Sequence, residues 1–225
     1  MHRALLFAMA VANLATVTSR SNACVDTALV LAVDGSGSIS DDEYAFQKSA
    51  IASAFRDASV MSAIRSAGRV SVAVVFWGDG EFPSQTIDFI DMDGVKPSEQ
   101  FAQEIERNER TVFGNTDIGS GIWTGLELLS RSRLCARRLI VDISGDGAET
   151  SAPKRRPSIS LLQARRRAEE MGVTINALVI SDEDVDLASY YTNRVIIGPN
   201  SFVMKIRTFA DFAQAIRLKL VRELS

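Results

Sequence analysis

The apolar positions along the chain form two kinds of pattern. Short runs rich in Val, Ile, Leu and Ala are typical of strands that are buried on both faces of a sheet. We expect six such strands, at residues 25–33, 69–77, 85–90, 138–143, 173–180 and 194–206, the last interrupted at Gly198-Pro199. Between these runs apolar residues recur at helical spacing, which predicts a helix after Ser40 and further helices over 98–108, 117–129, 158–171 and 209–223.

Several of the predicted helices carry sequence signals at their ends. Ser40 is followed three residues later by Glu43, which is the spacing of a capping box. Ser98 is expected to cap the helix that runs to about Asn108. Gly172 is expected to end the helix over 158–171, because glycine readily adopts the left-handed conformation that follows many helices.

The alternation of strands and helices predicts an α/β fold. We expect a single doubly wound, mostly parallel six-stranded sheet with helices on both faces. Only a short link through Gly78-Asp79-Gly80 joins the strands at 69–77 and 85–90, so these two are expected to be antiparallel and to give one antiparallel edge strand. The 225 residues contain no repeat and no low-complexity linker. We therefore expect one domain, over residues 24–225.

Residues 1–23 have the pattern of a secretory signal peptide. Arg3 precedes an apolar run over residues 4–17, and Ser21-Asn22-Ala23 offers small residues before a cleavage site after Ala23. The run is shorter than the roughly 20 residues of a membrane span, and no later segment reaches that length. We expect an exported protein without a transmembrane segment. A lipid anchor on Cys24 is a less favoured alternative, because Ser21 stands where a lipobox usually has Leu.

Composition excludes several classes of function. The formal net charge is -3, so there is no basic excess that would favour nucleic acid. The single histidine, His2, lies in the expected signal peptide, so the mature chain has no imidazole for a Ser-His-Asp triad or for zinc. The two cysteines, Cys24 and Cys135, are typical of a disulfide in an exported protein.

Candidate chemistry gathers in three turns, one after the first predicted strand, one before a predicted helix and one after the fourth predicted strand. Asp34, Ser36 and Ser38 follow the first strand in the segment Asp-Gly-Ser-Gly-Ser, which offers three hard oxygen ligands in one turn. Thr116, just before a helix, and Asp146, after the fourth strand, are expected at the same edge, where parallel α/β sheets bind their ligands. Oxygen ligands suit Mg²⁺, Mn²⁺ or Ca²⁺ rather than a soft metal. The sequence therefore predicts a divalent-cation site at this edge.

These residues, in this order and at these strand ends, resemble the von Willebrand factor type A (vWA) domain and its metal-ion-dependent adhesion site. The resemblance covers essentially the whole mature chain. The tail over residues 190–206 and 209–224 is also similar to a secreted bacterial branch of that superfamily, catalogued as domain of unknown function 1194. The resemblance implies export to a bacterial periplasm or to the extracellular space.

The resemblance also implies a ligand set and a role. Ser36 and Ser38 would bind the metal directly, Asp34 and Asp146 mostly through water, and Thr116 directly or through water. One coordination position would stay open for an Asp or Glu carboxylate of a protein partner that the sequence does not identify. The expected cofactor is Mg²⁺, with Mn²⁺ or Ca²⁺ as alternatives, and no nucleic acid is expected as a partner.

The same resemblance places the two cysteines on neighbouring strands. In the vWA sheet the first and fourth strands are adjacent, so Cys24 and Cys135 fall near the start of two parallel strands. Adjacent strands are about 4.8 Å apart, which suits the Cα spacing of a disulfide. A Cys24–Cys135 disulfide is therefore expected.

Two alternatives to metal-dependent binding remain open. The segment Ile-Asp-Phe-Ile-Asp-Met-Asp-Gly-Val resembles the motif of haloacid-dehalogenase-type phosphotransferases, in which Asp91 would be the nucleophile and Asp93 the acid/base with Mg²⁺. However, it follows the expected antiparallel strand, which puts Asp91 at the opposite edge from Asp34. The other alternative is a vestigial vWA domain without metal. We expect binding rather than catalysis, because no general base is paired with a nucleophile at the site.

One further aspartate lies inside a predicted strand. Asp142 belongs to the fourth apolar run, so its side chain needs a polar partner if it is buried. The sequence does not indicate which residue supplies that partner.

Overall fold

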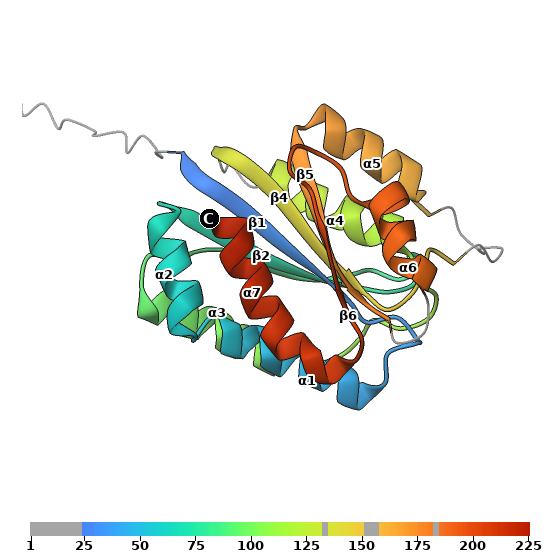
Figure 1. Ribbon diagram of the computed structural model, residues 1–225, viewed down its shortest axis with the longest axis horizontal. Coiled ribbons are helices and arrows are strands. Elements are labelled where there is room, and N and C mark those ends of the chain that lie inside the picture. The colour runs from blue at the N-terminus through green and yellow to red at the C-terminus, as the bar shows by residue number, and fades with distance from the viewer. Residues whose placement is uncertain (1–23, 132–134, 151–157, 182–184) are drawn as a thin grey trace, which may run out of the picture.

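The computed structural model describes residues 24–131, 135–150, 158–181 and 185–225, so the expected signal peptide over residues 1–23 lies outside the described residues. A single six-stranded sheet lies between two layers of helices (Figure 1). The strands are β1 (Val25–Asp34), β2 (Val70–Trp77), β3 (Gln85–Asp91), β4 (Ala136–Gly145), β5 (Val173–Ile180) and β6 (Val203–Ile206). The helices are α1 (Asp41–Ala54), α2 (Ala58–Ser66), α3 (Val95–Arg107), α4 (Ile118–Arg131), α5 (Leu161–Glu170), α6 (Val185–Tyr190) and α7 (Phe212–Leu224), with a π-helical turn at Tyr191–Val195 and a 3-10 turn at Phe209–Asp211.

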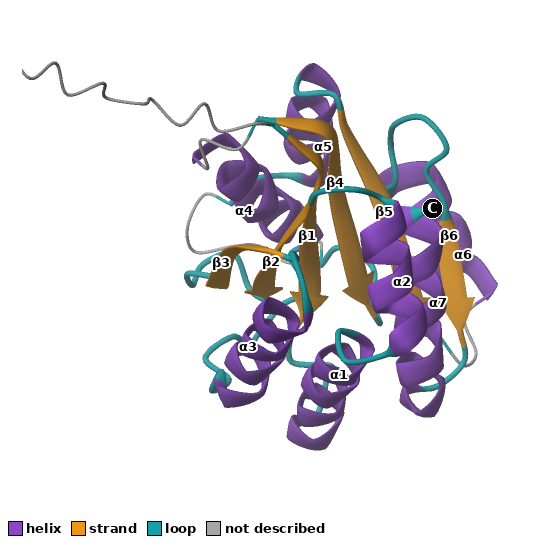
Figure 2. Ribbon diagram, turned by 90° about the vertical axis from the view of Figure 1, so that its left-hand side faces the viewer, coloured by secondary structure: helices purple, strands orange, loops and turns teal. Residues whose placement is uncertain are grey.

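The sheet has the strand order β3-β2-β1-β4-β5-β6. All neighbouring strands are parallel except β2 and β3, which are antiparallel, and this confirms the predicted fold class. Helices α1, α2, α3 and α7 cover one face, and α4, α5 and α6 cover the other (Figure 2). The carboxyl ends of the five parallel strands therefore meet at one edge, where Asp34 lies beside Trp77 and Val33 lies beside Ser144.

Strand β1 shows why these apolar runs form the centre of the sheet. Leu29 and Leu31 point into the core on the α1/α7 side, whereas Val30 and Ala32 point into the core on the α4/α5 side. Successive side chains of a strand face opposite ways, so a strand covered on both faces must be apolar throughout. Each fully buried Val or Leu contributes about 1.5–3 kcal/mol. Burial on both faces thus fixes where the strand ends, and with it the position of Asp34.

The helix signals are confirmed in part. The hydroxyl of Ser40 accepts a hydrogen bond from the backbone N–H of Glu43 at 3.3 Å, and the Glu43 carboxylate accepts one from the backbone N–H of Ser40 at 2.9 Å. This capping box fixes the start of α1. Gly172, with φ of 67°, follows the C-cap of α5 as expected. Helix α5 itself begins later than predicted, after a second capping box at Ser160.

The prediction that Ser98 caps a helix is wrong. Helix α3 begins at Val95, directly after Gly94, and Ser98 lies one turn inside it. The Ser98 side chain is buried, and its hydroxyl donates to the sulfur of Met61 at 3.1 Å. Met61 belongs to α2, which the apolar pattern did not predict and which Asp57 caps through the backbone N–H of Ser59 at 2.8 Å.

The predicted sixth strand is also partly wrong. Only Val203–Ile206 forms β6, whereas Tyr191–Val195 is a π-helical turn. Tyr191 and Val195 are both fully buried in the core on the α4/α5 side, because a helical turn brings residues four apart to the same side. A short apolar run fits a helix or a strand equally well, and here tertiary packing decides between them.

A disulfide joins two adjacent strands at the edge opposite the carboxyl ends. Cys24 and Cys135 are bonded, with their Cα atoms 4.5 Å apart, as expected. Each precedes its strand, and Val25 lies beside Ala136 in the parallel register of β1 and β4. The length of β1 places this bond roughly 30 Å from Asp34. Within the described residues, no helix is long and apolar enough to cross a membrane.

Candidate metal centre

The first loop of the candidate site connects β1 to α1. Asp34 is the last residue of β1, and its side chain is fully buried. Its Oδ1 accepts a hydrogen bond from the backbone N–H of Ser36 at 2.7 Å, and its carbonyl oxygen accepts one from Nε2 of Gln47 at 3.3 Å. The chain therefore turns sharply after the strand while the carboxylate stays inside the fold.

Three hydroxyl groups from two loops meet beside this carboxylate. The Oγ atom of Ser36 lies 3.2 Å from Oγ of Ser38 and 3.3 Å from Oγ1 of Thr116. Ser38 also donates a hydrogen bond of 2.7 Å to Oδ1 of Asp146, which directly follows β4. The five residues that the sequence predicts as metal ligands are thus brought together from three loops.

The five side chains differ in depth. Asp34 and Ser36 are fully buried, and Thr116 is 8% exposed. Asp146 is half-buried and Ser38 is exposed. The site is therefore closed at its base and open to solvent on the side of Ser38 and Asp146, where a ligand from outside could approach.

The electrostatics of the site show a shortage of positive charge. Burial raises the pKa of Asp34 to about 7, with a smaller contribution from the nearby Asp146 carboxylate and against the lowering effect of the backbone N–H groups of Ser36 and Asp146. Burial also raises the pKa of Asp146. The second carboxylate oxygen of Asp34, Oδ2, is buried without a hydrogen-bond partner. The site thus holds acidic groups that a cation would stabilise in their ionised form.

The loop that carries Thr116 is held by backbone contacts on both sides. The carbonyl oxygen of Gly114 accepts a hydrogen bond from the backbone N–H of Gly37 at 2.7 Å. Gly114 has a φ of 83°, which glycine adopts without strain. The backbone N–H of Thr116 donates to Oγ1 of Thr150 at 3.0 Å, and its carbonyl oxygen accepts from Thr150 at 2.8 Å. These contacts bring the hydroxyl of Thr116 to that of Ser36.

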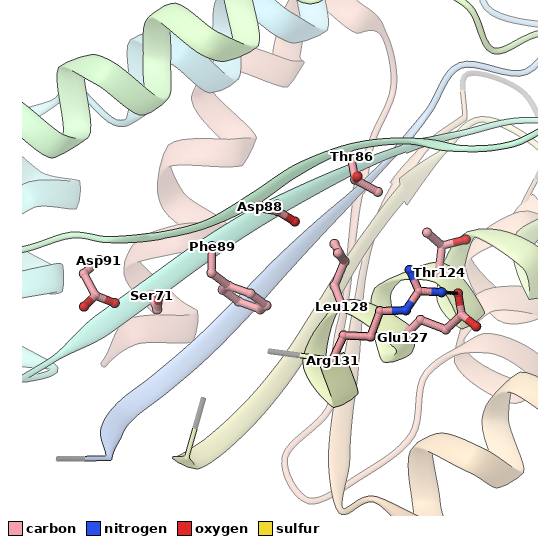
Figure 3. Close-up of a pocket in the computed structure, with 9 residues that line it drawn as sticks. All are labelled: Ser71, Thr86, Asp88, Phe89, Asp91, Thr124, Glu127, Leu128 and Arg131. Atoms are coloured by element: carbon pink, nitrogen blue, oxygen red, sulfur yellow. Dashed lines mark hydrogen bonds and ion pairs between the residues drawn. The ribbon is translucent and has the colours of Figure 1, made fainter. Parts of the chain in front are cut away.

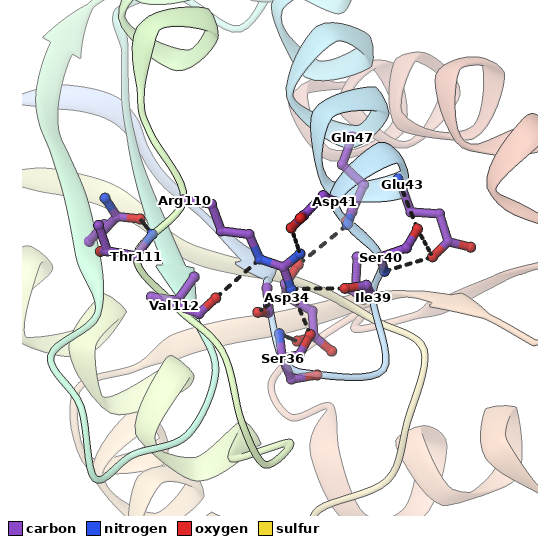
Figure 4. A network of polar contacts seen from close by, with 12 residues as sticks. Asp34, Ser36, Ile39, Ser40, Asp41, Glu43, Gln47, Arg110, Thr111 and Val112 are labelled. Atoms are coloured by element: carbon purple, nitrogen blue, oxygen red, sulfur yellow. Dashed lines mark hydrogen bonds and ion pairs between the residues drawn. The ribbon is translucent and has the colours of Figure 1, made fainter.

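Arg110 is a residue of the site that the sequence did not reveal. Its side chain is 10% exposed and lies beneath the loop between β1 and α1 (Figure 4). The guanidinium donates to the carbonyl oxygens of Gly35 and Ser36, both at 3.0 Å, and of Ile39 at 2.8 Å. It also pairs with Asp41 at 2.7 Å. One side chain therefore fixes three carbonyl groups of the loop that bears Ser36 and Ser38.

Two aromatic rings enclose the same guanidinium. Its Cζ atom lies 5.0 Å from the centre of the Tyr44 ring and 4.7 Å from that of Phe113. The loop around it is crowded, since a Cβ atom on Gly35 would lie 2.5 Å from Cγ2 of Val112. No sequence signal distinguishes Arg110 from a surface arginine, because its partners are backbone carbonyls more than 70 residues earlier in the chain.

The residues of the phosphotransferase alternative lie elsewhere. Asp91 ends β3 and lies opposite Ser71 near the start of β2, whereas Asp34 lies beside Trp77 at the end of β2. That separation corresponds to roughly 20 Å along the strand. Asp91 and Asp93 are both exposed. The structure does not bring them to the five predicted ligands.

The ligand set fits a hard divalent ion. It consists of two carboxylates and three hydroxyls, and oxygen ligands of this kind suit Mg²⁺, Mn²⁺ or Ca²⁺. The orphaned Oδ2 of Asp34 is an acceptor without a partner at the base of the site. The part of the chain that the structure describes contains no group of three or more His, Cys, Asp or Glu side chains that could hold a metal. The candidate site therefore depends on its hydroxyl groups as much as on its carboxylates.

Solved structures define the fold class. The chain is similar to the pilus adhesin SpaC from Lactobacillus rhamnosus GG in its open conformation, with a TM-score of 0.62 and 14% identity over 90% of this chain and 30% of the adhesin. It is equally similar to proximal thread matrix protein 1 from the mussel byssus with a zinc-occupied MIDAS motif, with a TM-score of 0.62 and 19% identity over 89% and 48% of the two chains.

A third structure carries the name of the fold. The chain resembles a von Willebrand factor type A protein from Catenulispora acidiphila, with a TM-score of 0.57 and 12% identity over 90% of this chain and 43% of the other. This chain thus spans less than half the length of each of the three proteins. At such identities the likeness shows the fold alone, which is that of a vWA domain.

A family model refines this assignment. The model described as "Protein of unknown function (DUF1194)" matches residues 23–225, so the chain belongs to this family. Among curated protein sequences, none matches the chain.

Proposed function

We propose that the protein is an exported vWA domain that binds a divalent cation and uses it for metal-dependent protein binding. The observation that carries this proposal is the buried carboxylate of Asp34, whose Oδ2 has no hydrogen-bond partner. Ser36 contacts this carboxylate through its backbone N–H, and its hydroxyl leads to those of Ser38 and Thr116 and, through Ser38, to the Asp146 carboxylate. An ionised carboxylate buried without a cation is costly, and a bound divalent ion would supply the missing positive charge.

The proposed roles of the residues follow from their depth. Ser36, Ser38 and Thr116 would hold the ion through their hydroxyl oxygens, and Asp34 and Asp146 would support it mostly through water. Mg²⁺ is the expected ion, with Mn²⁺ or Ca²⁺ as alternatives. The ion would supply an open coordination position on the exposed side of the site. Because only two of the five ligands are charged, the ion would keep enough positive charge to attract a carboxylate from a partner protein.

Export and adhesion are supported by separate features. The Cys24–Cys135 disulfide suits an oxidising compartment, and residues 1–23 have the sequence of a signal peptide. A pilus adhesin and a byssus matrix protein with a zinc-occupied MIDAS motif have the same fold. We propose that this chain likewise acts outside the cytoplasm, in a bacterial periplasm or in the extracellular space, and binds a protein that presents an Asp or Glu side chain.

The two alternatives predict different behaviour. A phosphotransferase that used Asp91 and Asp93 would depend on exposed carboxylates far from the other polar groups of the site. A vestigial domain would bind no metal. Neither alternative accounts for a buried carboxylate oxygen without a partner beside three hydroxyls.

The first experiment is a calorimetric titration of Mg²⁺, Mn²⁺ and Ca²⁺ into the exported protein. We expect saturable binding of at least one ion at one site. The Asp34→Ala/Ser36→Ala variant should lose this binding, because it removes the buried carboxylate and a hydroxyl that touches two others. Asp91→Asn is the matched control and should bind the ion as the wild type does. Absence of binding to the wild type would contradict the metal site.

The second experiment concerns the partner. Once the ion is known, partner capture should occur in its presence, stop with EDTA and be lost in Ser38→Ala. Hydrolysis of p-nitrophenyl phosphate that Asp91→Asn abolishes would instead support the phosphotransferase.

A further inference from the structure

A groove of about 780 Å³ lies between the edge strand β3 and helix α4 (Figure 3). A bulge in β3 shapes one wall of it. Val74 lies opposite Ile87 and Val72 lies opposite Ile90, so three residue steps on β3 match two on β2. A regular strand sends alternate side chains to opposite faces, and the extra residue shifts that alternation.

The bulge gathers four side chains of β3 along one groove. Thr86 and Asp88 line it, and so do Phe89 and Asp91 beyond the bulge. Figure 3 shows the Phe89 ring between the carboxylates of Asp88 and Asp91. An aromatic face attracts a cation, and flanking carboxylates strengthen that attraction. The arrangement suits an ammonium or guanidinium group.

The charges in the groove are only partly balanced within the chain. Glu127 of α4 pairs with Arg131 of the same helix at 3.1 Å. Asp91 has a loose contact with Arg69 at 3.8 Å, in which both side chains are about half exposed, and such pairs contribute little. Asp88 is exposed and forms no ion pair among the described residues. Two carboxylates of the groove are thus available to a partner.

A buried hydroxyl at the base of the groove points to a ligand independently of these charges. Ser71 of β2 is fully buried, lies opposite Asp91 and lines the groove. Its Oγ atom has no hydrogen-bond partner. A buried hydroxyl without a partner is costly, and a polar group of a ligand in the groove would satisfy it.

The position of the groove favours an extended peptide over a small cation. The lining residues of β3 run from Thr86 to Asp91, which corresponds to about 17 Å of strand. Strand β3 ends the sheet of the described residues, in which one side of its backbone has no neighbouring strand. An added strand pairs with such an edge through its backbone, and every second side chain then points to the same face.

We propose that the β3–α4 groove docks an extended segment of a partner protein that carries Lys or Arg at alternate positions. The segment pairs with the open edge of β3, and a cationic side chain lies over Phe89 between Asp88 and Asp91. This proposal does not depend on the metal site, which lies at the carboxyl edge.

The test uses the peptide acetyl-Val-Arg-Val-Arg-Val-amide, titrated into the exported protein with EDTA present so that the metal site is empty. We expect saturable binding that weakens with salt. Asp88→Asn/Asp91→Asn should weaken it at least tenfold, and Phe89→Leu about threefold to fivefold. The matched control is Asp93→Asn/Glu104→Gln, which removes one exposed and one half-buried acidic group outside the groove and should leave binding unchanged.

Two further probes separate the alternatives. A peptide with citrulline in place of both arginines keeps the shape and loses the charge, so it should bind at least tenfold more weakly. Agmatine carries the cation without a peptide backbone and should also bind much more weakly. The proposal is overturned if the citrulline peptide or agmatine binds as tightly as the arginine peptide. It is also overturned if no saturable binding occurs, or if the control variant loses as much affinity as the groove variant.

Discussion

Two aspartates, Asp34 and Asp142, are both buried in central strands of the sheet, but only Asp142 is paired with a cationic side chain of the described residues. Both are almost fully buried; burial raises the pKa of Asp34 to about 7, and burial together with the nearby Glu223 carboxylate raises the pKa of Asp142. Asp142 forms an ion pair of 2.5 Å with the ammonium group of Lys219. Among the described residues, no Lys or Arg pairs with Asp34.

Asp142 differs from Asp34 in having a cation within the chain, although its two carboxylate oxygens, like Oδ2 of Asp34, accept no hydrogen bond. Lys219 of α7 also pairs with Glu223 at 2.6 Å, and Oε1 of Glu223 accepts a hydrogen bond from Asn176 of β5 at 2.9 Å. The cluster therefore joins β4, β5 and α7 around one internal cation. The chain supplies a cation where an aspartate is needed only for the fold. The residues that the structure describes supply none at Asp34, beside an opening to solvent, and this difference is the best structural reason to expect an external cation there.

The largest effect should come from removing the internal cation. Lys219→Met leaves Asp142 and Glu223 buried without a positive charge, which typically costs 3–5 kcal/mol. We expect the free energy of unfolding, measured by urea denaturation, to fall by about that amount. The triple variant Lys219→Met/Asp142→Asn/Glu223→Gln removes the charges together and should recover most of the loss. A loss below about 1 kcal/mol in the single variant would show that the cluster needs no internal cation.

An intermediate effect is expected from Arg110, which shapes the other region. Arg110→Met removes the contacts to three loop carbonyls, and we expect metal affinity to fall about tenfold to a hundredfold, or 1.4–2.7 kcal/mol. Arg110→Lys keeps the charge without the planar fork and should fall in between. Titration of the ion into each variant measures this.

The same variant separates two possible roles of Arg110. If its charge mattered mainly by repelling the metal, Arg110→Met would bind the ion more tightly. That outcome would contradict a positioning role. Arg107→Met, an exposed arginine nearby on α3, is the control for the change in charge and should leave metal affinity unchanged.

A third expected effect is a pH dependence of the metal-free protein. Both aspartates have a higher pKa in the folded chain than the usual 3.8, so the folded state binds more protons than the unfolded state above about pH 4. The free energy of unfolding should therefore fall as the pH rises from 5 towards 8. Denaturation in EDTA at several pH values measures the slope.

A variant assigns the slope to each aspartate. Asp34→Asn should remove the contribution of Asp34 to the slope, which ends near pH 7. It should also raise the free energy of unfolding at pH 8, because it removes an unpaired carboxylate. This sign is opposite to that of Lys219→Met. An unchanged slope would contradict the difference between the two regions. Asp57 and Glu99 have pKa values near 2, so they change protonation only at lower pH. They do not contribute to the slope between pH 5 and 8.

The central strands and the five candidate ligands could be predicted from the sequence for a physical reason. Strands buried on both faces are apolar throughout, so β1 and β5 stand out as continuous runs. In a parallel sheet the residues that follow such strands meet at one edge, which places Asp34 and Asp146 together. The capping box at Ser40 depends on residues only three positions apart, so the start of α1 could also be predicted from the sequence.

The remaining features depend on contacts between distant residues. Arg110 has the sequence of a surface residue, and only the folded loop of residues 35–39 makes it a buried donor. The sequence predicted that a buried Asp142 needs a polar partner. It did not predict that Lys219 is this partner, because Lys219 lies 77 positions later and is one of several polar residues of α7. The turn at Tyr191–Val195 is helical because packing places Tyr191 and Val195 in the core, which the apolar pattern alone does not specify.

The disulfide determines the covalent path that a stretching force follows through the domain. A force applied between residues 24 and 225 passes from Cys24 directly into Cys135 and then through β4 towards α7, because the covalent bond bypasses the 110 residues between them. Asp34, Ser36, Ser38 and Thr116 all lie within that bypassed segment, together with Arg110. Of the five candidate ligands only Asp146 lies on the stretched path. Along the covalent path, tension would therefore enter the candidate site only at Asp146 and would reach the other four residues only through non-covalent contacts such as the Ser38–Asp146 hydrogen bond.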